Sequence, residues 1–118
     1  MTDARALVER FNAAWVRGDL AAVSACLADD VTYRPNAWDG PATTLRGREA
    51  VTAAFVDQLG PGEGPALGPV WAAGERVVCE WAWAPAEDGT VLCGLDVYRV
   101  RDGRIVAKDV YGKITAEG

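Results

Sequence analysis

The chain has 118 residues, of which 50% are apolar and 25% are charged, and this length predicts one compact domain over residues 1–118. Histidine is absent, which excludes a Ser-His-Asp triad, a Cys-His pair and a His-ligated zinc site. The net charge of −5 argues against nucleic-acid binding, and no apolar stretch approaches the roughly 20 residues that a membrane helix needs. The N-terminus lacks the basic start and apolar block of a signal peptide, so a soluble, cytoplasmic protein is expected.

Two amphipathic helices are predicted at the start of the chain. The first has Thr2 as its cap and ends at Gly18, and the second is capped by Asp19 and extends to Leu27. Both predictions depend on apolar residues that recur at steps of three and four positions. These residues are Leu7, Val8, Phe11, Ala14 and Trp15 in the first helix and Leu20, Val23 and Leu27 in the second.

A short strand, a loop and a third helix are predicted next. The strand covers residues 31–33 and ends at Pro35, because Asp29-Asp30 interrupts the preceding helical pattern. Residues 36–46 are rich in Pro, Gly, Asp and Thr, which is typical of a loop. The third helix runs from about Gly47 to Leu59, and the Gly- and Pro-rich stretch 60–65 is predicted to be a flexible connector.

The second half of the chain is predicted to consist of strands. Four candidates cover residues 66–72, 76–86, 90–101 and 104–115, and the turns between them contain Gly or Asp-Gly. Three helices followed by a four-stranded antiparallel meander give an α+β fold, with the helices packed on one face of a curved sheet.

The turn at Asp88-Gly89 predicts which side chains meet across the first long hairpin. A two-residue type I′ turn there pairs Trp81 with Asp96 and Trp83 with Gly94. Because cross-strand partners point to the same face, Trp81, Trp83 and Asp96 are expected to share one side of the sheet.

The second hairpin, at Asp102-Gly103, leaves two alternatives. A two-residue turn places Asp109 opposite Asp96, whereas a three-residue loop with a bulge at Gly103 places Lys108 there. The chemistry differs, because two adjacent carboxylates share a proton and a carboxylate beside an ammonium stays ionised.

Several segments together resemble the nuclear transport factor 2-like superfamily, which includes ketosteroid isomerases, SnoaL-like polyketide cyclases and limonene-epoxide hydrolases. The resemblance covers essentially the whole chain and implies a cone-shaped α+β fold. Three N-terminal helices would pack on a curved, mainly antiparallel sheet around a hydrophobic pocket. It also implies chemistry without a cofactor or metal, and a homodimer built from the other sheet face, where Trp71 is expected. The segments are Phe11 to Gly18, Gly18-Asp19-Leu20, Ala28 to Tyr33, Gly47 to Val51 and Leu95 to Ile105.

The resemblance also implies roles for single positions. Asp96 corresponds to the oxyanion-hole aspartic acid of ketosteroid isomerases and to the acid/base aspartate of SnoaL-like cyclases. Lys108, not Asp109, is placed on the cavity face, and we adopt the bulged hairpin for that reason. The oxyanion tyrosine and proton-shuttling aspartate of the isomerases correspond to Phe11 and Pro35, so steroid isomerisation by the usual route is not expected.

The predicted site combines three catalytic candidates with an apolar lining. Asp96 is the candidate acid/base, because an apolar enclosure suits a carboxylate to proton transfer near neutral pH. Lys108 would hold Asp96 ionised, bind an anionic group or act as an amine nucleophile, or else it is a solvated side chain at the mouth of the cone. Tyr33 would donate a hydrogen bond to a carbonyl or enolate oxygen. The substrate-binding candidates are Phe11, Trp15, Trp38, Trp81, Trp83, Tyr98 and Val110.

These observations predict a small cofactor-free enzyme that acts on a hydrophobic carbonyl compound, such as an aromatic or polycyclic ketone. Isomerisation, cyclisation and elimination all share a proton transfer beside the carbonyl group. The alternative is a domain of the same fold that binds a hydrophobic ligand or serves assembly without catalysis.

Overall fold

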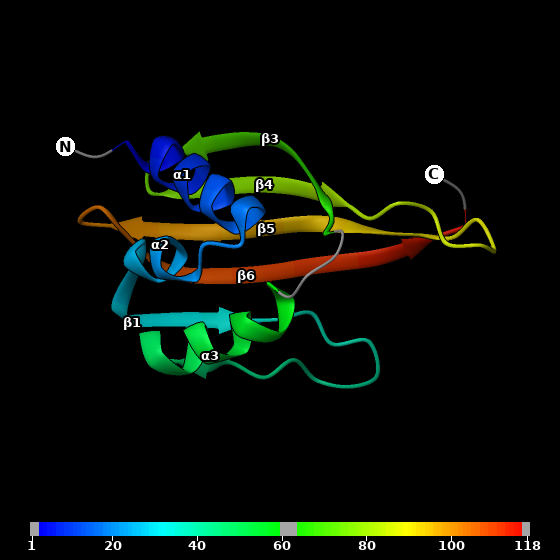
Figure 1. Cartoon of the computed structure of the whole chain (residues 1–118), viewed down its shortest axis with the longest axis horizontal. Coiled ribbons are helices and arrows are strands. Elements are labelled where there is room, and N and C mark those ends of the chain that lie inside the picture. The colour runs from blue at the N-terminus through cyan, green and yellow to red at the C-terminus, as the bar shows by residue number, and fades with distance from the viewer. Residues whose placement is uncertain (1–2, 60–63, 117–118) are drawn as a thin grey trace.

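A computed structural model describes residues 3–59 and 64–116 of the chain (Figure 1). Three helices from the N-terminal half pack on one face of a six-stranded, curved, mostly antiparallel sheet, which confirms the predicted fold class. No helix in these residues is long and apolar enough to cross a membrane. The elements are α1 (Ala4–Arg17), α2 (Leu20–Ala25), β1 (Leu27–Arg34), β2 (Leu45–Arg46), α3 (Arg48–Gln58), β3 (Ala66–Ala73), β4 (Arg76–Ala82), β5 (Val91–Arg101) and β6 (Arg104–Thr115).

Capping side chains and a glycine determine where the first two helices begin and end. Asp3 caps α1 by accepting a hydrogen bond from the backbone N–H of Arg5, whereas Thr2, the predicted cap, lies outside the described residues. Gly18 ends α1 in the left-handed region, with φ of 69°, and Asp19 caps α2 through the N–H of Ala22. Of the predicted 60–65 connector, residues 60–63 also lie outside the described residues.

The sheet contains more of the N-terminal half than predicted. Its strand order is β2-β1-β6-β5-β4-β3, and β1 runs parallel to β6. The prediction that the second helix extends to Leu27 is wrong, because Leu27 begins β1 and pairs with Ile105. The predicted 36–46 loop is also shorter than expected, since Leu45 and Arg46 form β2 against β1. An apolar residue at a strand start can coincide with a helical spacing, and only tertiary pairing separates the two.

The first long hairpin has a different register from the predicted one. Trp81 pairs with Gly94, where the two-residue turn paired it with Asp96. The loop is wider, because the N–H of Ala86 donates to the carbonyl of Thr90 around a three-residue turn. The offset is two residues, so Trp81 and Asp96 still share one face of the sheet.

The second hairpin combines a two-residue turn with a bulge farther along. Arg101 pairs with Arg104 around Asp102-Gly103, and both turn residues have positive φ, 54° and 73°. The predicted bulge at Gly103 is therefore wrong. The bulge lies instead at Val106, which is an extra, unpaired residue between Ile105 and Ala107.

The bulge decides which side chains of β6 face the helices. Beyond it Tyr98 pairs with Lys108, and Asp96 pairs with Val110. Lys108 therefore lies on the same face as Asp96, although not directly opposite it, and Asp109 points to the other face.

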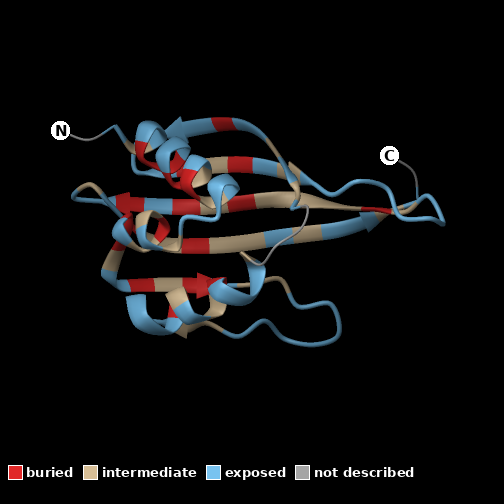
Figure 2. Ribbon diagram, viewed as in Figure 1, coloured by how far each residue is buried: buried red, intermediate tan, exposed pale blue. Residues whose placement is uncertain are grey.

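The core lies between the helices and this inner face of the sheet. Leu7, Val8 and Phe11 of α1 and Val51 and Phe55 of α3 are buried there. Burying each such side chain contributes about 1.5–3 kcal/mol. Figure 2 shows the buried residues concentrated where helices cover the sheet, whereas the far ends of the long strands β5 and β6 are mostly exposed or half-buried. The helices thus cover the inner face of the sheet at one end of the molecule and leave it uncovered at the other.

Candidate active site

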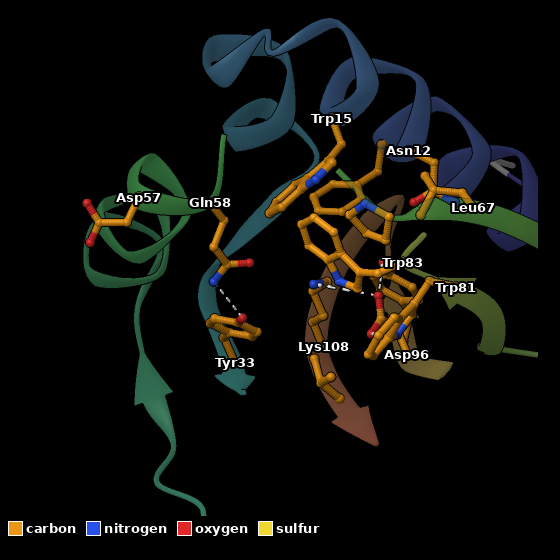
Figure 3. Close-up of a pocket in the computed structure, with 14 residues that line it drawn as sticks. Asn12, Trp15, Tyr33, Asp57, Gln58, Leu67, Trp81, Trp83, Asp96 and Lys108 are labelled. Carbon is orange, nitrogen blue, oxygen red and sulfur yellow. Dashed lines mark hydrogen bonds and ion pairs between the residues drawn. The ribbon is translucent and has the colours of Figure 1, made fainter. Parts of the chain in front are cut away.

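A cavity of about 330 Å³ lies between the inner face of the sheet and helices α1 and α3 (Figure 3). Every sequence-predicted site residue except Trp38 lines it. The sequence reasoning missed several lining residues from the helices and β3, which carry no distinguishing pattern. The lining residues are Phe11, Asn12, Trp15, Tyr33, Asp57, Gln58, Pro65, Leu67, Trp81, Trp83, Asp96, Tyr98, Lys108 and Val110.

Asp96 is a buried carboxylate with three donors around it. Trp81 Nε1 donates to Asp96 Oδ1 at 3.1 Å, and the Tyr98 hydroxyl donates to Oδ2 at 3.2 Å. Lys108 Nζ lies 3.6 Å from Oδ2 (Figure 3). Since each carboxylate oxygen accepts about two hydrogen bonds, Oδ1 keeps one acceptor position that these contacts do not use.

Lys108 is buried, so the alternative of a solvated side chain at the mouth of the cone is wrong. Its Nζ lies 5.1 Å from the ring centre of Trp15, 5.0 Å from that of Tyr33 and 5.4 Å from that of Phe55. The three ring faces and the Asp96 carboxylate stabilise the ammonium. Within residues 3–59 and 64–116, the ion pair with Asp96 is the one polar contact of this ammonium.

Tyr33 has its hydroxyl oxygen oriented by Gln58, a contact that sequence reasoning did not predict. Gln58 Nε2 donates to Tyr33 Oη at 2.9 Å (Figure 3). The phenol accepts this bond, so its own hydrogen stays available to an acceptor in the cavity.

Burial keeps two further groups near Asp96 protonated. Burial, together with the neighbouring Asp96 carboxylate, raises the pKa of Tyr98 well above its ordinary value. Burial also raises the pKa of the Cys79 thiol, against an opposing hydrogen bond from Asn12. Tyr98 is therefore a hydrogen-bond donor to Asp96, and Cys79 is an unactivated thiol.

Two glycines make room for tryptophan side chains at the open end of the cavity. Gly94 pairs with both Trp81 and Gly112. A Cβ on Gly94 would lie 2.8 Å from Trp81 Cζ2, and one on Gly112 would lie 3.1 Å from Trp38 Cη2. The indoles of Trp81 and Trp38 thus lie directly against the backbone of β5 and β6.

Trp38, which is predicted to bind substrate, is not among the residues that line the cavity. It is 53% exposed and lies over Gly112. The loop that carries it is tethered to the sheet, because the N–H of Gly112 donates to the Asn36 side chain at 2.9 Å. The described residues also contain no group of three or more His, Cys, Asp or Glu that could hold a metal ion.

Comparisons with known proteins agree with this architecture. Residues 8–108 match the SnoaL-like domain family. An NTF2-like protein of unknown function from Mesorhizobium loti is 26% identical with a TM-score of 0.81, and the match covers 93% of this chain and 90% of that one. A steroid delta-isomerase from Pseudomonas aeruginosa is 25% identical with a TM-score of 0.77, and the match covers 96% and 81%.

A proposed polyketide cyclase from Xanthomonas campestris pv. campestris is 30% identical with a TM-score of 0.68, and the match covers 92% of this chain and 88% of that one. No curated protein sequence matches the chain. The predicted resemblance is confirmed, because the family match spans most of the chain and these structures share its fold. The chain belongs to the SnoaL-like domain family, within the NTF2-like fold.

Proposed function

We propose that this chain is an enzyme that moves a proton at the carbon next to the carbonyl group of a hydrophobic ketone, without a cofactor. Asp96 would be the acid–base group. The observation that carries the proposal is a buried carboxylate beside a buried ammonium, both lining a cavity rich in aromatic side chains. A pocket with few convergent polar groups in an apolar wall is the usual form of a small-molecule site.

The proposed step uses the free acceptor position on Asp96 Oδ1. This oxygen takes the proton from the carbon beside the carbonyl group, and the electron pair of the broken C–H bond forms an enolate. The negative charge then lies on the ligand oxygen, where the Lys108 ammonium and the Tyr33 hydroxyl are the candidate stabilising groups. Return of the proton to another carbon gives an isomer, and attack of the enolate carbon on a second carbonyl group closes a ring.

The neighbouring structures support this reaction class. One is named a steroid delta-isomerase and another a proposed polyketide cyclase, and both reaction types pass readily through enolates. The chain departs from the isomerases at Phe11 and Pro35, so its oxyanion donors would come from Tyr33 on β1 and Lys108 on β6.

We also propose a cytoplasmic homodimer that forms through the outer face of the sheet. Trp71 on β3 and Tyr111 on β6 are 54% and 56% exposed, and large exposed aromatic residues on a sheet face favour association. The three cysteines, Cys26, Cys79 and Cys93, are free thiols, which is typical of a reducing compartment.

The test is exchange of solvent deuterium into 2-tetralone, a flat aromatic ketone, followed by proton NMR. The wild-type chain should accelerate exchange beside the carbonyl group above the buffer rate. Asp96→Asn should lower this acceleration by about 100-fold or more. Asp109→Asn is the matched control, because Asp109 lies on the neighbouring strand but points to the opposite face.

Equal exchange rates in wild type and Asp96→Asn would refute the proposed acid–base role. Tight binding of the ketone without any acceleration by the wild type would instead favour the non-catalytic ligand-binding domain. Circular dichroism of each variant establishes that the fold is retained.

A further inference from the structure

We propose that the ligand site continues beyond the cavity onto an apolar shelf that takes the far, apolar end of an elongated ketone. The shelf consists of Trp38, Trp83, Leu92 and Ile114, arranged around Gly112. This proposal rests on the proposed function in one respect, namely that the end of the ligand inside the cavity is a ketone. It predicts that the preferred ligand is longer than the cavity itself.

Strand pairing places the shelf on the same face as the cavity. Gly94 pairs with Gly112, and Leu92 pairs with Ile114 two residues farther along the same strands. The N–H of Trp83 donates to the carbonyl of Leu92, which extends the same ladder to β4. Because side chains two residues apart point to one face, Trp83, Leu92 and Ile114 form a row beside the glycines.

Helices do not cover this end of the sheet. In Figure 1, β5 and β6 extend beyond all three helices toward the C-terminus. Ile114 is 62% exposed and Trp83 is 40% exposed, and the last part of β6 is largely pale blue in Figure 2. Apolar side chains gathered on one open face are a common mark of a binding surface.

The shelf and the cavity are continuous. Trp83 lines the cavity and is at the same time part of the shelf. A Cβ on Gly112 would contact both Trp38, at 3.1 Å, and Trp81, at 3.3 Å. The tryptophan of the cavity wall and the tryptophan of the tethered loop therefore meet at one glycine, with no side chain of β6 between them.

The cavity volume favours a ligand as the occupant of the shelf. About 330 Å³ is near the lower end of the roughly 300–1,000 Å³ that is usual for small-molecule pockets. A ligand whose oxygen lies at Asp96 and Lys108 and whose body exceeds this volume can leave the cavity along the sheet past Trp83, which lines the cavity and is 40% exposed. The next surface that it meets is the row of Leu92 and Ile114.

The experiment compares 2-tetralone with 6-phenyl-2-tetralone, which has the same ketone and one added apolar ring at its far end. Isothermal titration calorimetry gives Kd for each. The phenyl compound should bind the wild type at least about tenfold more tightly. This factor corresponds to about 1.4 kcal/mol, which needs roughly 60 Å² of apolar contact.

Ile114→Ser should abolish most of this preference and leave the affinity for 2-tetralone unchanged, because the smaller ketone stays inside the cavity. Ile114→Leu should keep the preference. Val16→Ser is the matched control, since Val16 is 73% exposed and lies on α1.

Equal affinities for the two ketones, no binding of either, or an unchanged preference in Ile114→Ser would overturn the shelf. Sedimentation velocity provides a further test. Loss of a dimer in Ile114→Ser would show that a second copy of the chain covers this surface, and would refute the proposal that a ligand occupies it. The proposed function fails separately, through the exchange rate of Asp96→Asn, which the binding preference does not measure.

Discussion

Lys108 Nζ lies 3.6 Å from Asp96 Oδ2, and the two side chains are only 8% and 11% exposed. They come from neighbouring strands, β6 and β5, on the one face that the helices cover. Charges removed from water in this way depend on each other, because neither can regain its hydration without opening the core.

Lys108→Met is therefore expected to destabilise the protein by about 3–5 kcal/mol, because it leaves the Asp96 carboxylate buried without its countercharge. Urea unfolding followed by tryptophan fluorescence measures this change. Arg5→Met is the control, since the Arg5–Glu9 pair is 55% and 52% exposed and its loss should have a far smaller effect. Similar losses in the two variants would contradict the mutual dependence of Asp96 and Lys108.

Tyr98→Phe should change how stability depends on pH above about 10. The folded pKa of Tyr98 is raised well above its ordinary value of 10.0, so the unfolded chain loses this proton first as pH rises. Stability from the neutral phenol is complete below pH 10 and decreases above it, by about 1.4 kcal/mol per pH unit until the folded pKa is reached. Thermal unfolding at pH 9 and at pH 11 should show a smaller decrease for Tyr98→Phe than for the wild type. Parallel decreases would show that Tyr98 is not the group responsible.

Thiol labelling should distinguish the three cysteines. Cys93 is partly accessible, whereas Cys26 and Cys79 are 4% and 1% exposed. The raised pKa of Cys79 also lowers its thiolate fraction at neutral pH. Maleimide and mass spectrometry should therefore find one fast site at Cys93, and the other two should react only in denaturant. Fast labelling of Cys79 in the native protein would disprove the closed packing around Asp96.

Gly94→Ala should destabilise the protein by at least about 2 kcal/mol, because a Cβ there collides with the backbone oxygen of Tyr111 and with the Trp81 ring. Chemical denaturation of the variant gives the value. Gly40→Ala is the comparison, since a Cβ at Gly40 has no neighbour within 4 Å and its φ is not in the left-handed region. If the two alanine variants were equally stable, Trp81 would not lie against the strand in solution.

The sequence was sufficient to predict the helices and the shared face of the sheet, and the reasons are local. The apolar stripe of α1 has a period that only a helix satisfies, and the pairing predicted from the Asp88-Gly89 turn puts Asp96 on the same face as Trp81. The pairing of Trp81 was predicted two positions away from its true partner, yet the face was correct, because an even offset preserves it.

Other parts of the site depend on tertiary structure that no local pattern encodes. The contact of Gln58 with Tyr33 joins the end of α3 to β1. The two residues are distant in sequence, and no local pattern around either of them indicates that they meet. The sequence predicts that Trp38 binds substrate but not where its loop lies, and the Asn36 tether holds that loop over Gly112, outside the cavity lining. Leu27 satisfied a helical spacing, but pairing with Ile105 placed it in a strand.

The extra residue at Val106 has a consequence for how this cavity acquires its charge. Continuing the pairing of Arg101 with Arg104 without an interruption would place Asp109 opposite Asp96, so that two carboxylates would face each other in the interior. With the bulge at Val106, the same strand instead presents Lys108 beside Asp96. Regular pairing of Val106 with Arg99 would thus replace the ion pair by an acid dyad. Whether this interior is neutral or anionic therefore depends on one unpaired residue in the backbone of β6.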